Sequence, residues 1–142
     1  MKPAVLFLCT GNSARSQMAE GLLRKEAGDI FDVYSAGTSP KGIHPLTVRV
    51  MNAIGIDVSG QRSKHLSEYL GKLLVKHLII VCDQASRECP TTWPGASSRL
   101  VWLFDDPAAC QGTDEERLAK FRAIRDQIQA RIRDWLPSVR KA

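Results

Sequence analysis

The sequence predicts an α/β fold, a four-stranded parallel sheet with helices on both faces. Continuous apolar runs such as Ala4–Leu8 are typical of strands that are buried on both faces. Segments with helical spacing alternate with these runs, which is typical of a parallel sheet. Apolar residues make up 44% of the 142 residues, enough to fill one core, so a single domain over residues 1–142 is expected.

The first half of the chain is predicted to hold two strands and three helices. After the strand Ala4–Leu8, Ser16–Ala27 has apolar residues at helical spacing and is followed by Gly28, a helix stop. Pro45–Ile54 has an apolar inner face with the same spacing, and Gly55 closes it. The other elements expected in this half are a strand over Asp32–Ala36, ended by Gly37, and a helix over Leu66–Leu74.

The second half is predicted to hold two strands, His77–Cys82 and Arg99–Phe104, and a long amphipathic helix, Asp114–Trp135. In sheets of this kind the ligand lies beyond the carboxyl ends of the strands, where the strand order switches. Cys9 and Cys82 end predicted strands, and Asp105 and Asp106 follow another. These reactive side chains are therefore expected on one rim of the sheet.

Charge and hydropathy exclude several classes of function. Of the formal net charge of +5, most comes from the tail after Thr113, which has 8 basic and 5 acidic residues, as in the solvated face of a helix. Aromatic residues do not interleave these charges as in a single-strand groove, so no nucleic-acid binding is expected. The apolar runs are too short to span a bilayer, and the stretch after Lys2 lacks a signal-peptide cleavage motif. We expect a cytoplasmic protein that favours anionic ligands and binds no membrane.

The segment from Cys9 to Ser16 is predicted to cradle an oxyanion. Gly11 can take a positive φ and Asn12 tolerates the left-handed region, so successive backbone N–H groups can turn inward as an anion nest. The helix that follows adds its positive dipole end, and Arg15 supplies a planar fork of donors. The residues predicted to bind the anion are Thr10, Gly11, Asn12, Ser13, Ala14, Arg15 and Ser16.

Cys9 is the predicted nucleophile of this loop. The same positive elements would lower the pKa of the Cys9 thiol, and Ser16 could donate its hydroxyl hydrogen to the sulfur. The four cysteines at 9, 82, 89 and 110 show neither C-x-x-C nor metal-ligand spacing, so no metal and no cofactor is predicted. His44, His65 and His77 are scattered and are taken as surface or structural residues.

The stretch Cys9-Thr-Gly-Asn-Ser-Ala-Arg15-Ser16 resembles the phosphate loop of the low-molecular-weight protein tyrosine phosphatases and of their relatives, the thioredoxin-coupled arsenate reductases. The resemblance covers nearly the whole chain, through the segments at 34–38 and 55–57 and the pair Asp106-Pro107. It implies a low-molecular-weight phosphatase-like fold. It also implies that Asn12 and Ser35 hydrogen-bond to support the loop, and that Asp106 is the general acid, with Asp105 as second choice. By itself, Asp-Pro would indicate only the start of a turn.

Two features favour the reductase branch of this family over the phosphatase branch. Arsenate reductases similar to this chain have a redox pair seven residues apart after the third strand, and Cys82 and Cys89 match that spacing. Tyrosine phosphatases place aromatic residues after the Asp-Pro pair, whereas this chain has Ala108 and Ala109. The ring of a phosphotyrosine would therefore lack its stacking wall.

The resemblance thus implies reduction of arsenate, with phosphate or sulfate as mimics, through Cys9, Cys82 and Cys89 in turn and with thioredoxin or glutaredoxin as the reductant. A phosphomonoester hydrolase that uses only Cys9, Arg15 and Asp106 is the alternative. A non-catalytic oxyanion-binding module is a third interpretation. The role of Cys110 and the presence of a monovalent cation near Asn12 and Glu20 stay open.

Overall fold

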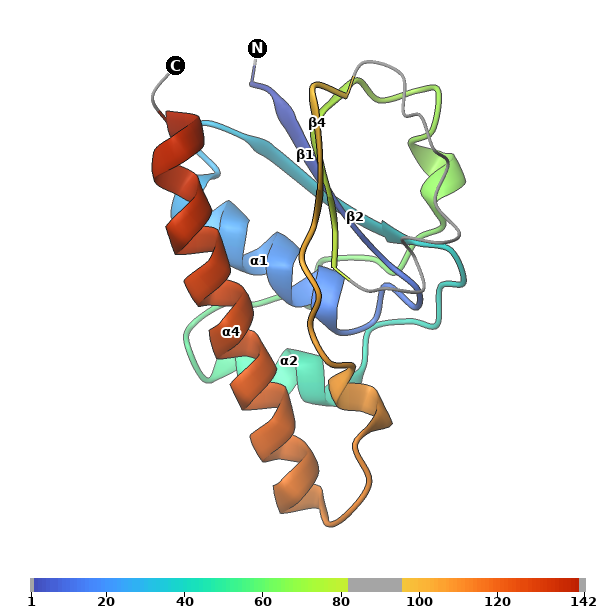
Figure 1. Ribbon diagram of the computed structural model, residues 1–142. Coiled ribbons are helices and arrows are strands. Elements are labelled where there is room, and N and C mark those ends of the chain that lie inside the picture. Colours follow the sequence, from blue (N-terminus) through green and yellow to red (C-terminus); the bar gives the residue numbers. More distant parts are fainter. Residues whose placement is uncertain (1, 82–95, 141–142) are drawn as a thin grey trace.

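The computed structural model describes residues 2–81 and 96–140, and in this part of the chain four parallel strands form one sheet (Figure 1). The strands run in the spatial order β2-β1-β3-β4. They are β1 (Ala4–Cys9), β2 (Asp32–Gly37), β3 (Val75–Ile80) and β4 (Ser98–Val101). The α-helices are α1 (Arg15–Ala27), α2 (Pro45–Asn52) and α4 (Asp114–Arg140), and two short 3-10 helices are η1 (Leu66–Glu68) and η2 (Pro107–Ala109). The predicted α/β fold with a four-stranded parallel sheet is confirmed.

Strand β1 is central, and this explains its unbroken apolar sequence. All six of its residues are buried, and it pairs on one side with β2, where Leu6 lies opposite Tyr34, and on the other with β3, where Phe7 lies opposite Ile79. Because the chain adds β2 on one side of β1 and β3 on the other, the strand order switches at β1. The carboxyl end of β1, Cys9, is thus the expected ligand position in such a sheet.

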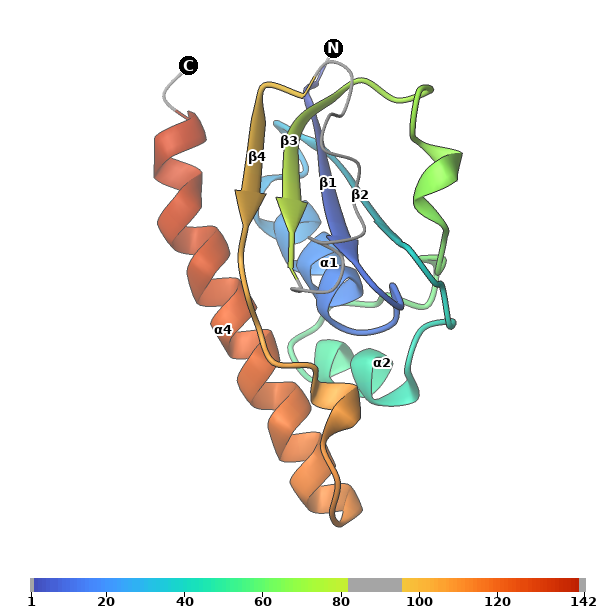
Figure 2. The same cartoon turned by 45° about the vertical axis from the view of Figure 1, so that its right-hand side comes forward.

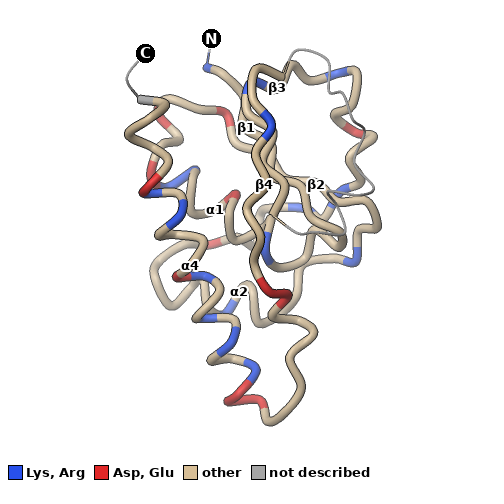
Figure 3. The backbone as a smooth tube through the Cα atoms, viewed as in Figure 1, with Lys and Arg blue, Asp and Glu red and all other residues tan. Residues whose placement is uncertain are grey.

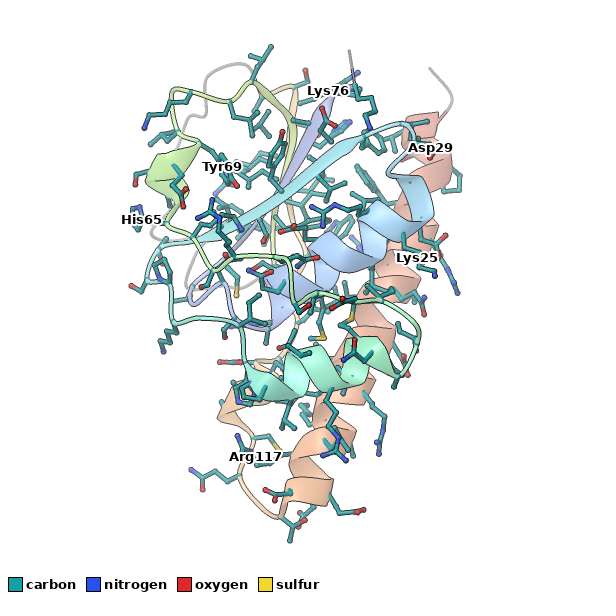
Figure 4. All side chains as sticks on the ribbon, turned by 180° about the vertical axis from the view of Figure 1, so that it is seen from behind. Lys25, Asp29, His65, Tyr69, Lys76 and Arg117 are labelled. Carbon is teal, nitrogen blue, oxygen red and sulfur yellow. The ribbon has the colours of Figure 1, made fainter. Side chains whose placement is uncertain are left out.

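In the described part of the chain, the two long helices α1 and α4 lie on one face of the sheet, and the segment around η1 lies on the other (Figure 2). Helices α1 and α4 pack against each other beside the sheet (Figure 2). On this face His77 of β3 packs edge-on against Trp135 of α4, with ring centroids 5.3 Å apart. Side chains alternate between faces along a strand, and on the opposite face Tyr34 of β2 packs against Tyr69, which follows η1, at 5.2 Å (Figure 4).

The long C-terminal helix is amphipathic, as the sequence predicts. Its apolar stripe, Phe121, Ile124, Ile128 and Ile132, is fully buried. Charged residues of both signs are distributed along the same helix (Figure 3). The helix runs to Arg140 rather than ending at the predicted Trp135, with Pro137 inside it. Leu136 is buried at 5% exposure, so packing holds the helix past the proline.

One predicted helix is wrong. The segment Leu66–Leu74 forms only the 3-10 helix η1 and then turns, because Gly71 takes a φ of +77°, which a right-handed helix cannot contain. Other boundaries shift by a few residues: α2 stops at Asn52, β3 starts at Val75, and β4 covers Ser98–Val101 instead of Arg99–Phe104. The predicted strand end Cys82 lies outside the described residues.

Within the described ranges, no helix has both the length and the apolar character that crossing a membrane requires.

Candidate active site

The predicted oxyanion loop lies at the carboxyl end of β1, on the rim where α2 and η2 also lie (Figure 2). Cys9 is the last residue of β1 and is 3% exposed. The loop then enters α1 at Arg15. A small pocket of about 110 Å³ opens here, lined by Cys9, Thr10, Gly11, Ser13, Ala14, Arg15, Lys41, Asp106 and Ala108. The structure therefore brings Asp106 together with Cys9 and Arg15, from which it lies far apart in the sequence.

The carbonyl groups of the loop point outward and are hydrogen-bonded there. Four of them accept hydrogen bonds from backbone N–H groups of residues 38–44: Cys9 from Thr38 at 3.3 Å, Thr10 from Ser39 at 2.9 Å, Gly11 from Lys41 at 2.9 Å and Ser13 from His44 at 3.0 Å. In a planar trans peptide the N–H points opposite to the C=O. The N–H groups of Thr10, Gly11, Asn12 and Ala14 therefore point away from this segment, as an anion nest requires.

Asn12 is the strained residue of the loop. Its φ is +46°, the left-handed region, and no other non-glycine residue in the described ranges has a positive φ. Gly11, for which the sequence allowed a positive φ, does not use one. The Asn12 side chain is fully buried and donates from Nδ2 to Ser35 Oγ at 3.0 Å and to Ser16 Oγ at 2.8 Å. Its Oδ1 accepts from the Lys64 backbone N–H at 2.8 Å.

A buried charge cluster lies behind Asn12. Ser35 Oγ donates to Glu20 Oε1, so a lone pair of the hydroxyl stays available to accept from Asn12. Glu20 is 5% exposed and pairs with Arg24 at 2.5 Å, and the Lys64 ammonium lies 3.9 Å from it. Burial lowers the pKa of Lys64, and the charge of Glu20 opposes that shift. Glu20 is thus paired with two cations. An unpaired carboxylate at this depth would carry a large desolvation cost.

Sequence reasoning did not find Lys64, and it named Glu20 only as a neighbour of a possible cation. A signal existed for Glu20, because it lies among the apolar residues Met18, Ala19, Leu22 and Leu23 of α1 and is therefore a charge on a helix that packs against the core. For Lys64 no local signal exists, since its position beside Glu20 follows from the tertiary structure.

The N-terminus of α1 is open toward the pocket. Its N-cap residue, Ala14, makes no side-chain hydrogen bond to the first turn, and no acidic residue lies in that turn. The first N–H groups of a helix need a partner from outside the helix, and their aligned dipoles attract negative charge. The end of the helix is thus suited to an anion bound in the pocket.

Arg15 is held in place while keeping donors for a ligand. Its Nη1 donates to the Phe104 carbonyl at 3.1 Å, and its Nη2 lies 3.7 Å from Asp106 Oδ2. Its Nε is buried and has no hydrogen-bond partner among the described residues. The guanidinium fork therefore retains a donor that an oxyanion can satisfy.

The two aspartates after β4 have different positions. Asp106 lines the pocket and is 44% exposed, and its Oδ1 accepts from the Ala108 backbone N–H at 3.0 Å. Asp105 instead pairs with Lys120 at 3.0 Å and is 79% exposed. Only Asp106 of the two is near the predicted nucleophile. Cys110, which follows η2, is half-buried, its thiol donates to the Gln111 carbonyl at 3.6 Å, and it does not line the pocket.

His44 supports the loop through its backbone N–H, in line with its prediction as a surface or structural residue. Its backbone N–H binds Ser13, its ring packs on Phe121 at 4.8 Å, and its Nδ1 accepts from the Leu46 N–H at 3.0 Å as the N-cap of α2. Burial and, next, Arg117 lower the pKa of His44. The neutral ring near pH 7 is the form that can accept this hydrogen bond.

The redox pair predicted at Cys82 and Cys89 falls outside the described residues.

Comparison with known proteins decides the family. The family model for low molecular weight phosphotyrosine protein phosphatase matches residues 4–142. The chain belongs to this family. The resemblance to its arsenate reductases, drawn from the loop and the cysteine spacing, is confirmed by the relatives. An arsenate reductase of Halalkalibacterium halodurans is 48% identical over 136 residues, which cover 94% of this chain and 95% of that protein.

Solved structures agree with this placement. An arsenate reductase in the phosphate binding state superposes with a TM-score of 0.77 at 29% identity, covering 98% of this chain and 99% of that one. The thioredoxin-dependent arsenate reductase of Corynebacterium glutamicum superposes with a TM-score of 0.75 at 29% identity, covering 98% of this chain and 62% of that chain. The chain is thus similar to arsenate reductases in both sequence and fold.

We predict that Gly37→Ala distorts the loop. A Cβ at Gly37 would lie 2.4 Å from the Thr10 carbonyl oxygen and 3.0 Å from the Asn12 nitrogen, both backbone atoms that cannot move without moving the nest. We expect a loss of about 1–3 kcal/mol in unfolding free energy and at least tenfold weaker binding of inorganic phosphate. Urea denaturation and isothermal titration calorimetry measure the two effects. In the control Gly60→Ala, the added Cβ has no atom within 4 Å, and unchanged phosphate binding is expected; equal losses in both variants would contradict the account.

We also predict that the Cys9 thiol titrates at least about one unit below the free-cysteine value of ~8.5, because the nest, the helix end and Arg15 favour the thiolate. Thiolate absorbance is followed against pH in a protein in which Cys82, Cys89 and Cys110 are serine, so that Cys9 is the one thiol left to ionise. Arg15→Gln should raise the midpoint. A midpoint at or above the free value would mean that the loop is not preorganised for an anion.

Proposed function

We propose that the protein reduces arsenate to arsenite, with Cys9 as the nucleophile and thioredoxin or another dithiol protein as the electron donor. The observation that carries the proposal is the pocket itself. It combines a cysteine, a guanidinium and inward N–H groups in about 110 Å³, well below the ~300–1,000 Å³ of pockets for drug-sized ligands. Ala108 lines it where a wall for an aromatic substituent would be needed. A small tetrahedral oxyanion fits this chemistry better than an aryl ester.

In the first step the Cys9 thiolate attacks arsenic and forms a sulfur–arsenic bond. The departing hydroxide takes a proton from the carboxyl group of Asp106 and leaves as water. Arg15 and the loop N–H groups bind the remaining oxygens, where negative charge is concentrated. The position of Asp106 in the pocket lining and the 3.7 Å between its Oδ2 and Arg15 Nη2 support this division of roles.

In the second step the Cys82 thiolate attacks the sulfur of Cys9. A disulfide forms, the sulfur–arsenic bond breaks, and its electron pair stays on arsenic, which leaves as arsenite. Cys89 then attacks Cys82, so that the disulfide moves to Cys82–Cys89 and Cys9 is released as a thiolate. The seven-residue spacing of Cys82 and Cys89 supports this order. The thioredoxin dependence named for the Corynebacterium glutamicum relative supports thioredoxin over glutaredoxin as the reductant of that disulfide.

A phosphomonoester hydrolase is the second candidate. The name of the matching family model and the presence of Cys9, Arg15 and Asp106 around one pocket favour it. Such an enzyme would form a phosphocysteine on Cys9 and hydrolyse it with water. It has no use for Cys82 and Cys89.

The deciding experiment sets the two reactions side by side. Arsenate is supplied with thioredoxin, thioredoxin reductase and NADPH, and NADPH oxidation is compared with the hydrolysis of an aryl phosphate by the same protein. We expect sustained arsenate-dependent NADPH oxidation and only slow ester hydrolysis. Cys9→Ser should abolish both, because a hydroxyl in the same place is not ionised at pH 7. Fast ester hydrolysis without arsenate turnover would give the assignment to the phosphatase.

We further predict different failures for the two distal cysteines. Cys89→Ser should complete one turnover and then stall as a Cys9–Cys82 disulfide, whereas Cys82→Ser should leave the arsenic adduct on Cys9 unresolved. Both variants should keep slow aryl-phosphate hydrolysis, which needs neither thiol. Peptide mass spectrometry of the stalled proteins identifies the linked cysteines.

Cys110→Ser is the matched control and should cycle normally. A Cys89→Ser protein that still turns over with thioredoxin would instead assign the resolving role to Cys110 or to an external thiol.

A further inference from the structure

Lys41 belongs to the pocket, although nothing in the sequence pattern singles it out. It comes from the segment of residues 38–44 that binds the carbonyls of the loop, and it lines the pocket with Cys9 and Arg15. Its aliphatic stem lies beside Gly11, since a Cβ built on Gly11 would be 3.4 Å from Lys41 Cδ. The ammonium at the end of this stem is therefore at the rim of an anion-binding pocket.

The backbone of Lys41 is fixed to the loop from two sides. Its N–H donates to the Gly11 carbonyl at 2.9 Å. The next residue, Gly42, takes a φ of +85° and donates from its N–H to Ser63 Oγ at 3.0 Å, and the same hydroxyl donates to the Gly11 carbonyl at 3.2 Å. The side chain is exposed, but its point of attachment is set by these bonds.

The charges of the proposed reaction call for a second cation. An anion that carries up to two negative charges must enter a pocket that already holds the Cys9 thiolate. The carboxyl group of Asp106 lines the same pocket and can add negative charge to it. The opposing charges are Arg15 and the partial positive charge of the α1 N-terminus, equivalent to roughly half a charge. Among the lining residues Lys41 is the other cation, and its approach would offset the excess negative charge.

We propose that Lys41 is a specificity-determining residue whose ammonium binds the outer face of the oxyanion and favours its doubly charged form over the singly charged form. The inference rests on the proposed function for the identity of the substrate, and on the pocket alone for anion binding. Inorganic phosphate, which loses its second proton near neutral pH, is the probe, because its affinity can be measured without any redox step.

The test measures phosphate affinity by isothermal titration calorimetry at two pH values, one below and one above the second ionisation of phosphate. Lys41→Met keeps the stem and removes the charge, and Lys41→Arg keeps a charge. Lys25→Met is the matched control, an exposed lysine in the last turn of α1, at the opposite end of that helix from the loop (Figure 4). We expect Lys41→Met to weaken binding about three- to tenfold above the second ionisation and less below it, with a smaller loss at high salt. Lys41→Arg should bind nearly as the parent protein, and Lys25→Met should be unchanged.

Three results would overturn the assignment of Lys41: unchanged affinity in Lys41→Met at both pH values, an equal loss at both, or an equal loss in Lys25→Met, which would indicate net charge alone. In arsenate turnover, Lys41→Met should raise KM with a smaller effect on kcat. A parent protein that binds phosphate but does not reduce arsenate would overturn the proposed function. The affinities of the variants would still decide the role of Lys41 in that case.

Discussion

The site depends on one constraint, that the backbone N–H groups of a short loop face a single point. Every peptide that turns its N–H inward must turn its carbonyl outward, and each outward carbonyl needs a donor. The segment of residues 38–44 supplies four such donors as a second layer of backbone around the loop. The anion site is therefore built from two segments, one following β1 and one following β2, and neither would hold its shape alone.

Asn12 is the point at which this constraint becomes strain. The left-handed backbone conformation of Asn12 costs free energy, because the residue has a side chain. The hydrogen bonds of its buried amide to Ser35, Ser16 and the Lys64 backbone offset this cost. The charge cluster at Glu20 then fixes the direction of the Ser35 hydroxyl. Buried charges rarely stabilise a fold by much, so the value of this cluster lies in orienting one hydroxyl behind the loop.

The loop lies between a set of positive groups that line the pocket and a neutralised carboxylate behind it. In front of the loop are Arg15, Lys41 and the uncapped end of α1, which favour an anion. Behind it the negative charge of Glu20 is neutralised by Arg24 and Lys64, so that little of it opposes a thiolate at Cys9. Asp106 is the exception, because its half-exposed carboxyl group lines the pocket itself. This position suits the proposed transfer of a proton to a departing group.

The local chemistry of the site and the class of fold could be predicted from the amino-acid sequence alone. The apolar run into Cys9, the small residues after it and Arg15 at the start of a helix are adjacent in the chain, so spacing alone predicts their arrangement. Alternation of strands and helices predicted the parallel sheet and placed Cys9 and Asp106 on one rim. The helix predicted over Leu66–Leu74 failed because Gly71 turns the chain, which apolar spacing does not register.

Contacts between segments that are distant in the sequence could be identified only in the three-dimensional structure. Lys41 and Lys64 have no local pattern, and each gains its position because one segment packs against the loop or behind it. The family resemblance already favoured Asp106 over Asp105, but only the structure shows that Asp106 lines the pocket while Asp105 pairs with Lys120. Hydrogen bonds and ion pairs are short-ranged and directional, so partners far apart along the chain become identifiable only once the fold has brought them together.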